Sequence, residues 1–241
     1  MNDFRVLNAA DSALVIEFGS TVDRAVSDQV LALGEALKGA GLPGVTEIVA
    51  TFRSLCVNYD PLVTTAAELE SAVTSLVQKT GVTSRARRLW DIPVCYDGEF
   101  APDLADVANA TGLRPVDVAE LHASVNYHVY MIGFVPGYPY MGDLPTKLHL
   151  PRRTNPRTRV PPGSVAIATS MTAVYPYESP GGWHLIGTSP VRFFDPESAN
   201  GALLGPGDAV RFRPVTSAEF ADIRRAVARN AYLPDSKEIA T

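Results

Sequence analysis

From Leu89 onward the chain consists of short β-prone runs separated by glycine and proline, and this pattern restricts its fold more than any other feature. Turns such as Gly205-Pro206-Gly207-Asp208 leave room only for short strands between them. Residues 89–241 are therefore predicted to form a β-barrel or sandwich. The strands are expected at residues 90–96, 127–135, 165–169, 183–186, 191–194 and 209–212.

Helices are expected to interrupt this series. Pro102 and Pro115 suit the first turn of a helix, so short helices are predicted at 102–110 and 115–122. Thr216 is followed by Glu219, a capping-box pattern that predicts a last helix near the C-terminus.

The first 84 residues have a different pattern, in which strands and helices alternate. Apolar runs at 13–16, 45–51 and 55–59 predict strands. Helical spacing from Val22 to Leu37, closed by Gly39 and Gly41, predicts one helix, and a capping box at 65–68 predicts a second. We predict an α+β domain at 1–84, a basic connection with Arg85, Arg87 and Arg88, and the β-rich domain at 89–241.

Composition narrows the class of function. The net charge of −5 gives no electrostatic reason to bind nucleic acid or anionic lipid. No basic leader and no long apolar run is evident, so a soluble cytoplasmic protein is expected. Cys56 and Cys95 stand alone in apolar runs and are interpreted as small buried residues rather than a disulfide or metal ligands.

The segment 133–142 is dense in glycine, proline and aromatic residues. Pro136 and Gly137 fix the backbone, while Phe134, Tyr138 and Tyr140 are set along it. Such a segment is either a rigid structural turn or the wall of a binding site, and composition does not separate these two interpretations.

The segment 151–161 carries four arginines between prolines, at Arg152, Arg153, Arg157 and Arg159. Guanidinium groups bind carboxylate and phosphate well, so an anion site is one interpretation. The alternative is that these arginines are solvated or form surface ion pairs.

The segment 175–184 places Glu178, Ser179 and His184 beside glycines that allow a ligand to approach the backbone. No Ser-His-Asp triad follows from this spacing. The histidines lack the spacing of zinc ligands, and no metal site is predicted. Neither a phosphate-loop nor a dinucleotide-binding sequence is present, so any ATP is expected to need help from another chain.

Six segments together resemble the 5-oxoprolinase B-subunit family, which is also known as allophanate hydrolase subunit 1 or as the KipI-type sporulation kinase inhibitor. The resemblance implies that the second domain is a cyclophilin-like β-barrel. It also implies a complex with the C subunit (KipA-type) and the A subunit (LamB/YcsF-type), which uses ATP, with magnesium, to convert 5-oxoproline to glutamate. The matching segments are Asp11-Ser12-Ala13-Leu14, Arg53-Ser54-Leu55, Asn58-Tyr59-Asp60-Pro61, 133–142, 151–161 and 178–187.

The resemblance also suggests roles for individual residues. Arg157 and Arg159, with Arg153 beside them, are candidates to hold a carboxylate or phosphate. Glu178 and His122 are candidates for proton transfer. The residues expected to surround a small ring are Phe134, Pro136, Gly137, Tyr138, Tyr140 and Trp183.

Three alternatives to a 5-oxoprolinase subunit stay open from the sequence. The KipI name implies a protein that binds and inhibits a histidine kinase, which needs a docking surface but no catalytic residue. A protein that acts on allophanate or another amide would have the same architecture. A prolyl isomerase is the third, and the fold alone does not carry that activity. Phe52, Tyr138 and His184 depart from the pattern of the family, which bears on the choice of substrate.

Overall fold

The computed structural model describes residues 4–79, 87–198 and 200–239, and the chain divides into two compact units, the second of which begins at Arg87. The predicted connection contains Arg85, which lies outside the described residues. Arg87 and Arg88 belong instead to a strand, where they pair with Ile239 and Glu238. Interpreting these two arginines as part of a linker was wrong, because the strand extends further toward the N-terminus than its apolar residues indicate.

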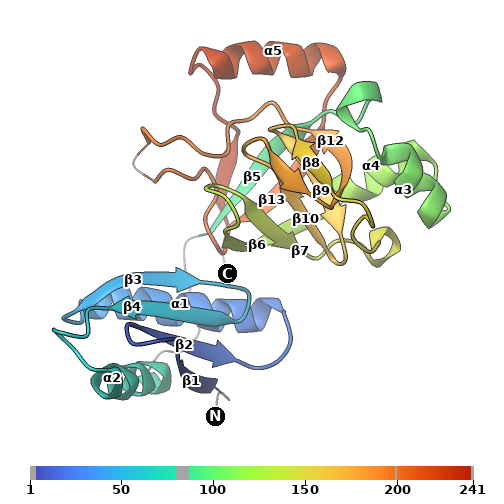
Figure 1. Ribbon diagram of the computed structural model, residues 1–241. Coiled ribbons are helices and arrows are strands. Elements are labelled where there is room, and N and C mark those ends of the chain that lie inside the picture. The colour runs from blue at the N-terminus through green and yellow to red at the C-terminus, as the bar shows by residue number, and fades with distance from the viewer. Residues whose placement is uncertain (1–3, 80–86, 199, 240–241) are drawn as a thin grey trace. The chain divides into compact units, whose positions relative to one another are not determined.

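The first unit is a four-stranded antiparallel sheet with two helices (Figure 1). Period-two alternation buries Leu14, Ile16, Leu55 and Val57 on the face that packs on the helices. Cys56 points to the other face and is only half-buried, so its predicted burial was wrong. The predicted strands and helices of this unit are confirmed, with one strand missed. The elements are β1 (Phe4–Asn8), β2 (Ala13–Phe18), α1 (Arg24–Ala40), β3 (Val45–Ala50), β4 (Ser54–Tyr59) and α2 (Ala66–Lys79).

The second unit is built on an eight-stranded sheet in the order β12-β9-β10-β7-β6-β13-β5-β14, in which only β5 and β13 are parallel among the described residues. Two hydrogen bonds of 2.9 Å between Cys95 and Thr188 join the end of β5 to the end of β12, so the sheet closes on itself (Figure 1). The likeness to cyclophilins stays a prediction. The strands are β5 (Arg87–Val94), β6 (Asn126–Ile132), β7 (Pro139–Gly142), β9 (Ser164–Ala168), β10 (Met171–Val174), β12 (His184–Thr188), β13 (Ala209–Pro214) and β14 (Ser236–Ile239).

A two-stranded ribbon and short helices complete this unit. The ribbon pairs β8 (Arg157–Val160) with β11 (Ser179–Gly181). The helices are η1 (Gly98–Phe100), α3 (Leu104–Thr111), α4 (Pro115–Ala123), η2 (Thr146–Leu148) and α5 (Ser217–Ala228). The three predicted helices are confirmed. In the part of the chain described, no helix has both the length and the apolar character that crossing a membrane requires.

One predicted strand of this unit is confirmed with an earlier end, and another was wrong. The strand expected at 127–135 ends at Ile132, because the backbone turns sharply at Phe134. The segment 191–194 forms no strand although Val191 and Phe193 are both buried. Its alternation fits a strand, but the segment has only an isolated bridge from Phe194 to Ala202.

His122 lies in the core of this unit and is fully buried. Thr172 Oγ1 donates to the Ala166 carbonyl (3.1 Å), so it accepts the hydrogen bond from His122 Nε2 (2.9 Å). His122 Nδ1 therefore accepts from the Tyr96 hydroxyl (2.8 Å). Since the ring reaches no solvent, this placement speaks against the predicted role in proton transfer and assigns His122 a structural role.

Burial lowers the pKa of His122 to about 3, below the ordinary value near 6.5. The unfolded chain then binds a proton that the folded chain excludes, so stability is full above pH 6.5 and falls as the pH drops. We expect a loss of about 2 kcal/mol between pH 7 and pH 5, measured by urea denaturation.

His122→Gln should be less stable at pH 7 and should lose this part of the pH dependence. His149 is exposed, and His149→Gln is the matched control that keeps the slope. Equal slopes in the wild type and His122→Gln would show that another group is responsible.

Candidate functional site

Asp103 is the N-cap residue of α3, directly before Leu104, yet its side chain makes no hydrogen bond to that helix. Its carboxylate is 3% exposed. One oxygen accepts from Arg157 Nη2 (2.6 Å) and Arg153 Nη1 (3.0 Å). The other accepts from Arg157 Nη1 (2.9 Å) and from the Leu185 backbone N–H (2.7 Å). The carboxylate thus holds together three segments that are far apart in the sequence.

This cluster carries two positive charges and one negative charge. Burial alone would raise the pKa of Asp103, but the hydrogen bonds from Arg157 and Leu185 outweigh it and keep the pKa below its usual value. Asp103 is therefore ionised near neutral pH. The side chains of Arg153 and Arg157 keep 28% and 26% exposure, so an incoming anion can reach them.

The ribbon β8–β11 sets the position of Arg157, which lies opposite Gly181. A Cβ atom at Gly181 would lie 2.3 Å from the Tyr175 hydroxyl, so only glycine fits this close approach. Arg153 is held by its backbone, since its N–H donates to the Gly182 carbonyl (2.8 Å). Glycines 181 and 182 therefore shape the backbone around the two arginines.

Three buried polar atoms of these segments have no hydrogen-bond partner among the described residues: Arg153 Nε, Ser179 Oγ and His184 Nδ1. His184 Nε2 donates to the Pro151 carbonyl (2.9 Å), which leaves Nδ1 as an acceptor. Buried polar groups are normally satisfied, and an unsatisfied one commonly marks a place where water or a ligand binds. We define the arginine site as Asp103, Arg153, Arg157, Ser179 and His184.

An aromatic cluster packs close to the arginine site, on the small side chains of β9 and β10. Tyr138 contacts Tyr175 edge-on, with ring centroids 5.0 Å apart. The ring centroids of Tyr140 and Trp183 are 6.1 Å apart. The guanidinium of Arg152 lies 5.9 Å from the centre of the Trp183 ring. Tyr138 and Trp183 are buried in this cluster, so they form its interior rather than the wall of an open cavity.

Phe134 is the exposed edge of the same cluster. Its φ of +69° and the hydrogen bond from the Val135 N–H to the Gly133 carbonyl (2.9 Å) define a γ-turn of the rare, strained kind. Pro136 and Gly137 follow as the centre of a second turn, in which a Cβ at Gly137 would lie 2.8 Å from the Phe193 carbonyl oxygen. Both turns hold the Phe134 ring outward, 58% exposed and edge-on to Tyr138.

Glu178 and Arg159 pair with each other rather than with Asp103. Arg159 Nε donates to Glu178 (2.8 Å), and the Arg159 side chain is 76% exposed. They form a surface ion pair, which is the interpretation that the sequence left open for some of these arginines.

Asp103 was missed by the sequence analysis. Its position directly after Pro102 is that of an ordinary helix-capping residue, and this hid its role. The signal that could have found it is the arginine-rich segment itself, because buried guanidinium groups require a buried carboxylate.

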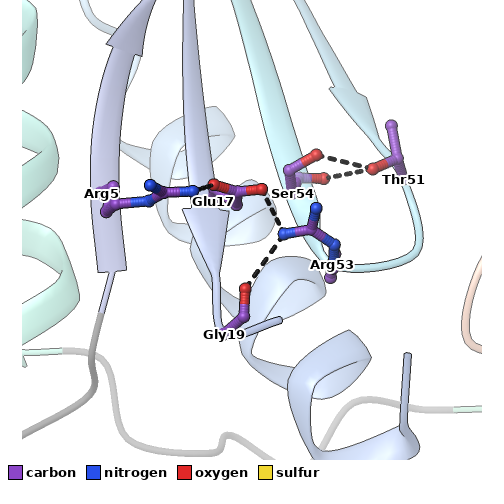
Figure 2. A network of polar contacts seen from close by, with 6 residues as sticks. All are labelled: Arg5, Glu17, Gly19, Thr51, Arg53 and Ser54. Carbon is purple, nitrogen blue, oxygen red and sulfur yellow. Dashed lines mark hydrogen bonds and ion pairs between the residues drawn. The ribbon is translucent and has the colours of Figure 1, made fainter. Parts of the chain in front are cut away.

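A second arginine–carboxylate network lies in the first unit (Figure 2). Glu17 accepts from Arg5 and Arg53, which lower its pKa, and Arg53 also donates to the Gly19 carbonyl (3.0 Å). In the adjacent turn Thr51 Oγ1 donates to the Ser54 carbonyl (3.1 Å). None of these side chains has an unsatisfied buried atom, so we interpret the network as structural, stabilising the turns next to β2 and β4.

The described residues contain no group of three or more histidine, cysteine, aspartate or glutamate side chains placed to hold a metal ion.

From the arginine site we predict that removing the Asp103 carboxylate lowers the stability of the second unit. Asp103→Asn keeps a residue suited to the start of a helix but leaves two guanidinium groups without their anion. We expect the free energy of unfolding of the second unit to fall by about 3 kcal/mol, measured by urea denaturation.

Asp106→Asn is the matched control, because Asp106 lies exposed on the same helix, and its cost should stay below about 0.5 kcal/mol. Similar stability of the two variants would mean that the arginines do not depend on Asp103.

Comparison with known proteins places this chain in a family. The carboxyltransferase domain family, subdomains C and D, matches residues 4–204. The 5-oxoprolinase B subunit of Bacillus subtilis (strain 168) is 35% identical over 231 residues, which are 90% of this chain and 95% of the relative.

Solved structures agree with this result. The crystal structure of TTHA0988 is 38% identical with a TM-score of 0.76 over 85% of this chain, and this chain spans 40% of its length. The K. lactis urea amidolyase has a TM-score of 0.82 over 100% of this chain, which spans 16% of that protein. At 18% identity this likeness shows the fold alone, a mixed α and β fold. From the family match and the relative that spans nearly its whole length, the chain belongs to the 5-oxoprolinase B-subunit family.

Proposed function

We propose that this chain is the B subunit of an ATP-dependent 5-oxoprolinase, which converts 5-oxo-L-proline to L-glutamate together with its C and A subunits. The observation that carries the proposal is the arginine site, where two guanidinium groups share one buried carboxylate and three buried polar atoms lack a partner. The name of the Bacillus subtilis relative supports the same activity.

The chemistry of the substrate fits a site with excess positive charge. An unstrained lactam is a poor electrophile, and phosphorylation of its carbonyl oxygen creates a group that water can displace. 5-Oxoproline carries a carboxylate, and its activated form also carries a phosphate. Arg153 and Arg157 can bind either anion through charge-assisted hydrogen bonds.

Each residue of the arginine site then has a defined task. Asp103 fixes the plane of the Arg157 guanidinium and holds that of Arg153 by one hydrogen bond before the substrate arrives, which lowers the entropic cost of binding. Ser179 Oγ can donate to an anion or accept from the ring N–H. His184 Nδ1, with its free lone pair, can accept from the same N–H or from a water molecule.

Other chains would complete this site. Tyr138 and Trp183 are packed against each other, so the exposed ring of Phe134 is left to face a partner or the substrate. This chain spans less than half of TTHA0988, so in that protein the fold occurs beside further polypeptide. A shared site would explain how a chain without a phosphate-loop sequence takes part in an ATP-dependent reaction.

The proposal is tested by glutamate release that depends on ATP and 5-oxoproline. We expect turnover when this chain is combined with the C and A subunits, and none with this chain alone. Arg157→Lys keeps the charge but loses the two-pronged contact with Asp103 and the anion, so kcat/KM should fall by about 100-fold or more.

The matched control is Arg211→Lys, because Arg211 forms a similar two-pronged pair with Asp91 on β13 and β5 (2.6 and 2.7 Å). Its kcat/KM should stay within about twofold of the wild type. Absence of turnover in the full mixture, or equal losses in the two variants, would contradict the proposal.

A further inference from the structure

The second unit contains a cleft of about 600 Å³ that includes none of the residues predicted from the sequence to form the site. It lies between α5, η1 and the turns at 161–164 and 188–192. Figure 1 shows α5 lying across one end of the strands of this unit. The volume falls in the range of sites that enclose a small organic ligand.

The walls of the cleft are preformed. The two turns are bonded to each other, since the Ser189 N–H donates to the Gly163 carbonyl (2.8 Å). A Cβ at Gly163 would lie 2.3 Å from the Ser189 carbonyl oxygen, so the turns approach as closely as a glycine allows. Rigid walls lower the entropic cost of binding. Five prolines line the cleft, at positions Pro102, Pro161, Pro162, Pro176 and Pro190.

One side of the cleft is apolar and aromatic. The partly exposed ring of Phe100 packs on the buried ring of Phe220, with centroids 4.5 Å apart, and Val227 continues the same wall along α5. Thr188 Oγ1 donates to the Phe100 carbonyl (2.7 Å) and so fixes this part of the wall. Such a surface suits a flat ring.

Cationic side chains lie at the same cleft. The exposed side chain of Arg224 holds its guanidinium 5.7 Å from the centre of the Phe220 ring. Arg192 donates to Asp195 (3.1 Å) and Asn230 (3.3 Å). Glu99 is the one acidic residue of the lining, so the lining carries a net positive charge.

We propose that this cleft binds a nucleoside triphosphate, with its base against Phe100 and its phosphates near Arg224 and Arg192. A flat ring joined to a polyanion matches both sides of the cleft, whereas a ligand as small as 5-oxoproline would leave most of the volume to water. The inference rests on the proposed function, because the ATP-dependent reaction supplies the nucleotide. It adds the place on this chain where the nucleotide binds.

Isothermal titration calorimetry of the purified chain with ATP and magnesium tests the inference. The wild type should bind ATP more tightly than AMP, since the phosphates contact the guanidinium groups. Arg224→Ala should weaken ATP binding by about tenfold or more. Val227→Trp fills the cleft and should abolish binding, while thermal denaturation verifies that each variant is folded.

Arg225→Ala is the matched control, because Arg225 is the next residue of α5 and pairs with Asp222 instead of lining the cleft. Its affinity should stay within about twofold of the wild type. Equal affinity in the wild type, Arg224→Ala and Val227→Trp would overturn the inference.

The KM for ATP of the complete complex separates this inference from the proposed function. Turnover with an unchanged KM in Arg224→Ala and Val227→Trp, together with no ATP binding to the isolated chain, overturns the cleft and leaves the function standing. A raised KM in both variants supports the cleft. Binding of ATP that depends on Arg224, without turnover of 5-oxoproline, supports the cleft and overturns the proposed function.

Discussion

The second unit depends on one buried carboxylate. Asp103 connects the start of α3 with Arg153, with Arg157 on β8 and with the backbone of β12. Burying a carboxylate is costly unless it is fully hydrogen-bonded, and here four donors meet its two oxygens. Because both oxygens are occupied, Asp103 gives up the helix cap that its position would normally provide. The fold thus gives up a local interaction in order to connect distant segments.

The second constraint is the close approach of neighbouring groups to the backbone at two glycines. These contacts place the aromatic cluster beside Arg153 and Arg157. Gly181 lets the Tyr175 hydroxyl reach the strand opposite Arg157, and Gly137 lets its turn rest on the Phe193 carbonyl. A side chain at either position would push the turns apart and separate the rings from the guanidinium groups. The strained backbone of Phe134 lies in the turn directly before Gly137.

Sequence alone predicted the elements whose signals are local. The capping box at Thr65 is present, since its hydroxyl accepts from the Glu68 N–H and the Glu68 carboxylate accepts from the Thr65 N–H. At the predicted box of Thr216 the threonine hydroxyl accepts from the Glu219 N–H, while the Glu219 carboxylate pairs with Arg213. The sequence did not predict which side chains that lie far apart along the chain would contact each other. Glu178 and His122 both suit proton transfer by residue type, yet one forms a surface ion pair and the other a buried hydrogen-bond network. Nothing local in the sequence distinguishes these settings, because each is decided by residues that lie far along the chain or on another strand.

The charge count of the arginine site explains why it is suited to bind an anion rather than only to stabilise the fold. With a second carboxylate the guanidinium groups would be neutralised, and with none they would repel each other and lose their orientation. One carboxylate for two arginines leaves a single unbalanced positive charge in a partly desolvated place, where electrostatic interactions are stronger than in water. Arg152, held over Trp183, adds a further positive charge nearby. In a chain with a net charge of −5, such a local excess of positive charge concentrates anions where the orienting groups are already in place.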